Sequence, residues 1–150
     1  MSAKDQAFVD VETAYVDFRN LLTPLDDEAY SEVVEGEWNV DHVLAHMAGW
    51  FRELAPVFAR LGRGEAPPAA SDYDDSWNTR FAAAALHGQE ALDDFDEAFH
   101  VFYGAAKVLD EAHFEPIAGE PSEAAGLLVG MGAEHFAEHR PAIEAWLARP

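Results

Sequence analysis

Apolar side chains recur every three or four positions over most of this chain, which is the spacing of one face of an α-helix. The spacing predicts substantial helices over Ala3–Leu22, Val40 to about Leu61, about Glu90–Ala112 and about Ser122–Leu147. The apolar stripe of the first helix consists of Phe8, Val11, Tyr15, Phe18 and Leu22. Alternating apolar and polar residues, which mark a strand, are missing over any length. The pattern therefore predicts an all-α fold, namely a four-helix bundle.

Turn-forming residues separate the predicted helices. Thr23 and Pro24 predict the start of a new helical turn, in which Thr23 is the N-cap and which ends near Tyr30. The segment Gly62–Pro68 is a loop by composition, and Trp77–Leu86 predicts a minor helix.

Two prolines fall inside predicted helices. Proline removes one backbone hydrogen-bond donor, and its ring crowds the preceding helical turn. We therefore expect Pro56 to kink or break the second helix, and Pro141 to distort the last helix just after His139.

Composition narrows the possible functions. The chain has 150 residues, which suits a single domain over residues 1–150, and its formal net charge is −20. Such a charge repels a phosphate backbone, so nucleic-acid binding is excluded as a primary role. The absence of cysteine excludes disulfides and thiolate metal sites. No apolar run approaches membrane-spanning length and the N-terminus has no hydrophobic signal core, so a cytoplasmic protein without a membrane partner is expected.

Three histidines in the predicted helices form a candidate metal site. His46 lies among apolar residues such as Val43 and Met47, so it is expected to face the core. His135 and His139 are four positions apart and therefore lie on one helix face. Two imidazoles at this spacing can bind one first-row divalent ion, and His46 would complete a three-nitrogen set. Such a set leaves coordination positions open for chemistry.

Other interpretations of these histidines stay open. A lone His46 is more often a core histidine with protein partners, and the other pair could lie on an exposed face. His42 and His46 form a second pair four positions apart. His42 is thus a candidate to replace His46 as a ligand or to join it. We rank it below His46 because it lies in the first helical turn.

Asn78 and Arg80 are the candidate substrate-binding residues. They follow Trp77 where the acidic segment Ser71–Ser76 meets the minor helix. In one interpretation Trp77 belongs to the core and Asn78 merely begins the helix. In the other, Asn78 or Arg80 lies at the mouth of a pocket, where an anionic substrate would need a cation.

Three stretches of the sequence, in this order, resemble the DinB/YfiT-like superfamily. They are Trp38-Asn39 followed by His46 and Trp50, then Trp77-Asn78, then Glu134–His139 followed by Ile143 and Trp146-Leu147. The second stretch is similar to a segment of the mycothiol-dependent maleylpyruvate isomerase and colibactin-resistance-like branches. The resemblance covers nearly the whole chain.

The resemblance implies an up-down-down-up four-helix bundle, often a homodimer. It implies a divalent metal, commonly zinc or nickel, on His46, His135 and His139. Several relatives are thiol-dependent transferases or isomerases that use bacillithiol, mycothiol or glutathione, and a bound metal could lower the pKa of such a thiol. The family often has an acidic residue or glutamine in place of His42, closing a capping box onto Asn39. We expect an imidazole to do this less well.

The first hypothesis is therefore a metal-dependent enzyme acting on a small molecule, such as a low-molecular-weight thiol transferase or isomerase in detoxification. The second is a metal-free binding or resistance protein that sequesters or hydrolyses a reactive metabolite. The third is a dimeric structural module.

Overall fold

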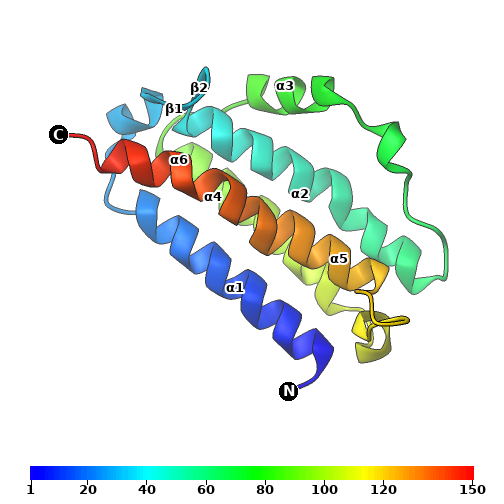
Figure 1. Cartoon of the computed structure of the whole chain (residues 1–150). Helices are drawn as coiled ribbons and strands as arrows, with labels where there is room; N and C mark the ends of the chain where they lie inside the picture. The colour runs from blue at the N-terminus through cyan, green and yellow to red at the C-terminus, as the bar shows by residue number, and fades with distance from the viewer.

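The computed structural model describes residues 1–150 as a helical bundle (Figure 1). Its long helices are α1 (Ala3–Leu22), α2 (Val40–Gly62), α4 (Gln89–Lys107) and a last helical segment made of α5 (Glu123–Val129), the π-helical turn η4 (Gly130–Glu134) and α6 (His135–Leu147). The shorter elements are η1 (Asp27–Ser31), the strands β1 (Val33–Glu35) and β2 (Trp38–Asn39), η2 (Ala70–Asp72), α3 (Asp75–Ala83) and η3 (Glu111–Phe114). No helix is both long and apolar enough to cross a membrane.

The long helices follow an up-down-down-up order. In Figure 1, α1 and the α5–α6 segment run in one direction, and α2 and α4 run in the other. Two parallel helices that follow each other in the chain need a crossover, and the segment that contains α3 supplies it. Helix α3 packs against α2 on the outside of the bundle (Figure 1). The predicted all-α bundle and its order are thus confirmed.

The core is built from the apolar stripes of the long helices. All five residues of the predicted α1 stripe are buried. Phe136 of α6 lies between the other helices, with its ring centroid 5.3 Å from that of Phe18 and 5.9 Å from that of Phe51. Burying one such side chain contributes about 1.5–3 kcal/mol. The aromatic core therefore fixes α6, which carries two of the candidate ligands, against α1 and α2.

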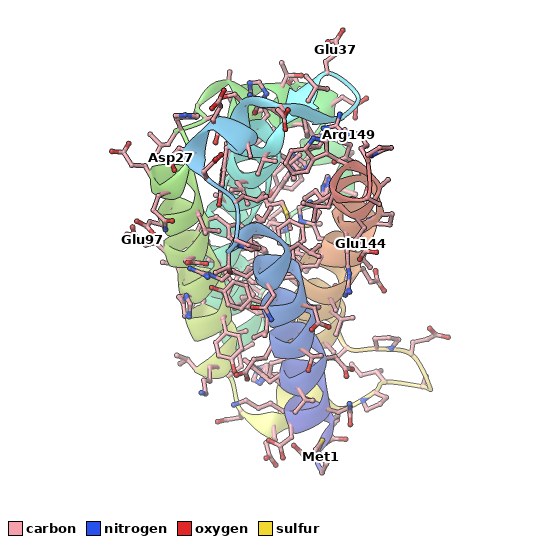
Figure 2. The ribbon with its side chains drawn as sticks, turned by 90° about the vertical axis from the view of Figure 1, so that its left-hand side faces the viewer. Met1, Asp27, Glu37, Glu97, Glu144 and Arg149 are labelled. Carbon is pink, nitrogen blue, oxygen red and sulfur yellow. The ribbon has the colours of Figure 1, made fainter.

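Most of the acidic residues lie at the surface. Figure 2 shows Asp27, Glu37, Glu97 and Glu144 projecting outward from different elements, and all four are exposed. Most of the negative charge therefore surrounds the bundle, which favours solvation of the surface, and Asp41 is the buried exception.

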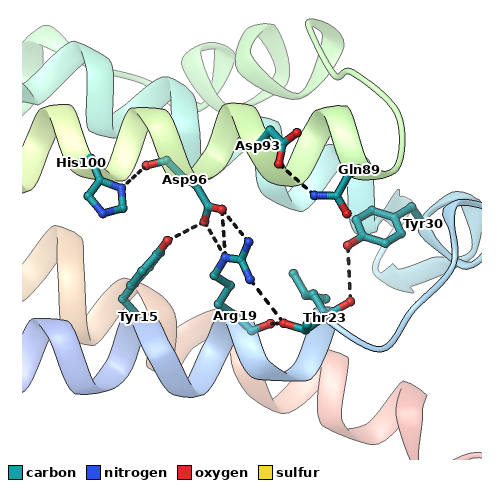
Figure 3. A network of polar contacts seen from close by, with 9 residues as sticks. Tyr15, Arg19, Thr23, Tyr30, Gln89, Asp93, Asp96 and His100 are labelled. Atoms are coloured by element: carbon teal, nitrogen blue, oxygen red, sulfur yellow. Dashed lines mark hydrogen bonds and ion pairs between the residues drawn. The ribbon is translucent and has the colours of Figure 1, made fainter.

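A polar network joins α1 to α4 (Figure 3). The Nε and Nη2 atoms of Arg19 lie 2.9 and 2.8 Å from the carboxylate oxygens of Asp96, and the hydroxyl of Tyr15 donates to Asp96 at 2.5 Å. Burial, and then the bond to Asp96, raise the pKa of Tyr15 well above its ordinary value. Because the ion pair is partly exposed, it contributes little to stability.

A small β-hairpin precedes α2, although the sequence analysis expected no strand. Strands β1 and β2 pair antiparallel through Glu35 and Trp38. Gly36 makes the turn with φ of 57°, a conformation that glycine adopts at little cost. The hairpin is too short to produce an alternating pattern, which is why periodicity missed it.

The prediction for Thr23 was also wrong. Thr23 ends α1, and its backbone N–H donates to the carbonyl of Arg19. The cap of the following turn is Asp26, whose carboxylate accepts from the backbone N–H of Ala29 at 3.0 Å. A carboxylate at this position satisfies a free N–H of the new turn, so the restart falls three residues later.

Neither proline breaks its helix. Helix α2 continues through Pro56 to Gly62, and α6 continues through Pro141. The irregularity in the last segment is η4, before the histidines. There Gly132 allows a close approach to α1, since a Cβ atom on it would lie 2.8 Å from Cγ1 of Val11.

A buried aspartate fixes the start of α2 to the start of α4. Asp41 accepts from the backbone N–H of Gly88 at 2.9 Å, and Nδ1 of the exposed His87 lies 2.7 Å from its other oxygen. The hydrogen bond to Asp41 raises the pKa of His87 above its ordinary value. Protonation of His87 therefore favours the folded state.

We expect this pair to make stability depend on pH. The contribution of His87 is complete below the ordinary histidine pKa of about 6.5 and is lost as the pH rises through the raised pKa. Thermal unfolding of the wild type and His87→Gln should show a larger difference in melting temperature at mildly acidic than at alkaline pH. His100→Gln, at another exposed histidine, is the control. A difference that grows with pH would contradict the assignment.

Candidate metal centre

Helices α2 and α6 bring His46, His135 and His139 together inside the bundle. Nε2 of His46 lies 3.1 Å from Nε2 of His135, and one ring nitrogen from each of the three lies within 4.8 Å of the others. The residues are 6%, 4% and 5% exposed, respectively. Three imidazoles thus share one site with little access to water.

Several of these ring nitrogens have no partner in the protein. They are Nδ1 of His46, Nδ1 of His135 and Nε2 of His139. A buried polar atom without a partner costs about 1–3 kcal/mol, and such atoms rarely gather in a core. The contact between the other nitrogens of His46 and His135 needs a shared proton or a shared cation. This arrangement fits a cation better than it fits a hydrogen-bonded core.

The imidazoles of His46 and His135 are neutral at physiological pH. Burial, and then the nearby His139, lower the pKa of His46 to about 4. Burial lowers the pKa of His135 to about 3, with smaller contributions from His139 and His46 and an opposing one from the main chain of Met131. Neutral imidazoles have free lone pairs, which metal coordination requires.

The donor set fits a first-row divalent ion. Imidazole nitrogen suits zinc, nickel, copper and iron, whereas calcium and magnesium prefer oxygen. Three protein ligands leave coordination positions of the metal open, as in catalytic zinc sites. Structural zinc sites, in contrast, have four protein ligands. The residues present therefore fit the metal that the sequence suggested.

Two residues of the hairpin border this site, and sequence reasoning missed both contacts. Oε2 of Glu35 lies 2.7 Å from Nδ1 of His139. The rings of Trp38 and His46 lie 4.9 Å apart between centroids. No local signal could have paired Glu35 with His139, because 104 positions separate them.

The structure assigns His42 a place in the helix cap. Its backbone N–H donates to Oδ1 of Asn39 at 2.8 Å, and its Nδ1 accepts from the backbone N–H of Asn39 at 3.2 Å. An imidazole thus closes the capping box, and its ring makes the longer of the two hydrogen bonds. Since Nδ1 is engaged there and the residue is outside the cluster, His42 is not a replacement for His46.

Asn78 and Arg80 lie on α3, beside α2. Oδ1 of Asn78 accepts from the indole N–H of Trp50 at 2.7 Å, one helical turn beyond His46. The guanidinium of the exposed Arg80 lies 4.1 Å from the ring centroid of Trp77. Asn78 therefore joins α3 to α2, whereas Arg80 contacts a ring of its own helix. The role of both residues in substrate binding stays a prediction.

The comparisons with known proteins agree with this fold. The sequence profile described as DinB superfamily matches residues 10–143. The chain belongs to the DinB superfamily. No curated protein matches this DinB superfamily chain in sequence.

Solved structures resemble this DinB superfamily protein in fold. A Streptococcus pneumoniae structural-genomics protein is 12% identical, with a TM-score of 0.78 over 98% of this chain and 91% of that one. An uncharacterised protein from Clostridium difficile 630 is 15% identical, with a TM-score of 0.72 over 96% and 95%. The third is a mycothiol-dependent maleylpyruvate isomerase, 14% identical, with a TM-score of 0.72 over 93% of this chain and 60% of the isomerase. At these identities the likeness concerns the fold alone.

Proposed function

We propose that this protein binds one divalent metal ion through His46, His135 and His139 and is an enzyme that acts on a small molecule. The observation that carries the proposal is the meeting of three buried imidazoles, each with one ring nitrogen that lacks a side-chain partner. Their depressed pKa values keep His46 and His135 ready to bind a cation. Zinc and nickel are the proposed metals.

A low-molecular-weight thiol is the proposed co-substrate. A bound divalent ion would act as a Lewis acid that lowers the pKa of such a thiol. The protein itself has no cysteine, so the thiol must come from outside the chain. A structural neighbour is a mycothiol-dependent isomerase, which supports the same chemistry here. We propose thiol transfer or isomerisation, by a homodimer, as the activity.

Metal analysis of protein purified without a histidine tag tests the first part. We expect about one ion per chain in the wild type and none in the triple variant His46→Ala, His135→Ala and His139→Ala. His100→Ala, at an exposed histidine, should keep the wild-type content. A triple variant that keeps its metal would contradict the assignment, and a metal-free wild type would favour the binding-protein or structural alternatives.

Thiol consumption tests the second part. Bacillithiol, mycothiol and glutathione are each offered with a panel of electrophiles to the zinc- or nickel-loaded protein. We expect turnover with one thiol class that is lost in the triple variant. Equal thiol loss with both proteins would contradict thiol chemistry at this site.

A further inference from the structure

The hairpin of β1 and β2 presents two side chains to the metal centre. Glu35 and Trp38 are opposite each other in the antiparallel register, on either side of the turn at Gly36. Residues directly opposite on such a pair project to the same face of the hairpin. This face lies against the ligands, since Glu35 contacts His139 of α6 and Trp38 contacts His46 of α2.

The carboxylate of Glu35 restricts the protonation pattern of His139. An ionised carboxylate only accepts hydrogen bonds, so at 2.7 Å Nδ1 of His139 must donate. A neutral imidazole with its proton on Nδ1 has a free lone pair on Nε2. That Nε2 atom is buried and has no partner in the protein.

The other two ligands lack such a contact. Nδ1 of His46 has no hydrogen-bond partner, and the ring of His135 has only the main chain of Met131, in its own helical segment, near its Nδ1 side. His139 is therefore the one ligand whose ring nitrogen contacts a carboxylate from another element. A metal ligand held in this way keeps its tautomer and its ring orientation before the metal arrives.

We propose that the hairpin Val33–Asn39 positions the ligands and that Glu35 is a positioning residue for metal binding. Glu35 holds His139 in the tautomer with the proton on Nδ1, which leaves Nε2 for the ion. Trp38 covers the ring of His46 from the same hairpin. This inference rests on the proposed metal binding, and it adds a residue that neither the family match nor the structural neighbours assign.

The test compares Glu35→Ala and Glu35→Gln with Glu37→Gln in zinc titrations against a chelating dye. Glu37 is the matched control, because it lies in the same turn, projects outward in Figure 2 and makes no hydrogen bond. We expect Glu35→Ala to weaken zinc binding about 10–100-fold, the usual effect of losing a partner of a ligating histidine. Glu35→Gln should lose less zinc affinity, because its amide oxygen still accepts the hydrogen bond from Nδ1 of His139. Glu37→Gln should bind zinc like the wild type.

A second readout uses the metal-free protein. Imidazole ¹⁵N spectra should show His139 with its proton on Nδ1 in the wild type and in Glu37→Gln, and a mixture of tautomers in Glu35→Ala. An unchanged melting temperature of metal-free Glu35→Ala would show that the effect is local. The proposal is overturned if Glu35→Ala matches Glu37→Gln in both zinc affinity and tautomer. A wild type that binds neither zinc nor nickel would refute the proposed function, and the tautomer would still decide whether Glu35 positions His139.

Discussion

Replacing His46 and His135 together by leucine is expected to abolish metal binding and to stabilise the metal-free protein. The two imidazoles contact each other, are buried, and each has a further nitrogen without a partner. Replacing both partners of a buried polar pair by apolar groups is neutral or stabilising, and removing an unsatisfied buried group gains about 1–3 kcal/mol. At this chain length 1 kcal/mol shifts the melting temperature by about 2–4 °C.

Zinc should stabilise the wild type alone. A ligand at 100 times its dissociation constant stabilises the folded state by about 2.7 kcal/mol, so the wild type should gain about 5–10 °C. The double variant should gain nothing. Thermal unfolding followed by circular dichroism, with chelator and then with zinc, measures both effects, and His100→Leu is the control. A double variant that is less stable without metal and equally stabilised by zinc would show that the imidazoles are ordinary core residues.

The largest loss of stability is expected for Phe136→Ala. Phe136 is 1% exposed, and rings from α1, α2 and α4 surround it. These rings belong to Tyr15, Phe18, Phe51, Phe95 and Phe99. Truncating a buried phenylalanine costs about 3–5 kcal/mol through lost contacts and the cavity that remains. Since Phe136 follows His135, the cavity would also loosen the metal centre.

Denaturant unfolding measures this effect. Phe81→Ala is the comparison, because Phe81 is half-buried on the peripheral helix α3. Its truncation should lower the free energy of unfolding clearly less. If the two variants lost equal stability, the aromatic cluster around Phe136 would not be the centre of the core.

Local patterns predicted most of the fold. Helical periodicity depends on residues three and four apart, so it located α1 and α2 to within one residue at each end. The predicted end of the third long helix was less accurate. Helix α4 ends at Lys107, because the chain turns there into η3 and packs Phe114 against the core. Ends depend on such tertiary contacts more than on periodicity.

The site was only partly accessible from sequence. The spacing of His135 and His139 is a local property of a helix, and the apolar surroundings of His46 indicated that it faces inward. Glu35 belongs to a hairpin too short to leave a pattern, and its contact with His139 exists only in the folded chain. The capping role of His42 was open to local reasoning, since it needs only the three-residue spacing from Asn39.

Anomalous scattering from a crystal grown with zinc, measured on both sides of the zinc absorption edge, tests the metal centre most directly. We predict one strong peak bounded by the imidazoles of His46, His135 and His139, with Glu35 still bonded to His139. A crystal saturated with zinc that shows no peak between these three rings would contradict the metal centre and the function built on it.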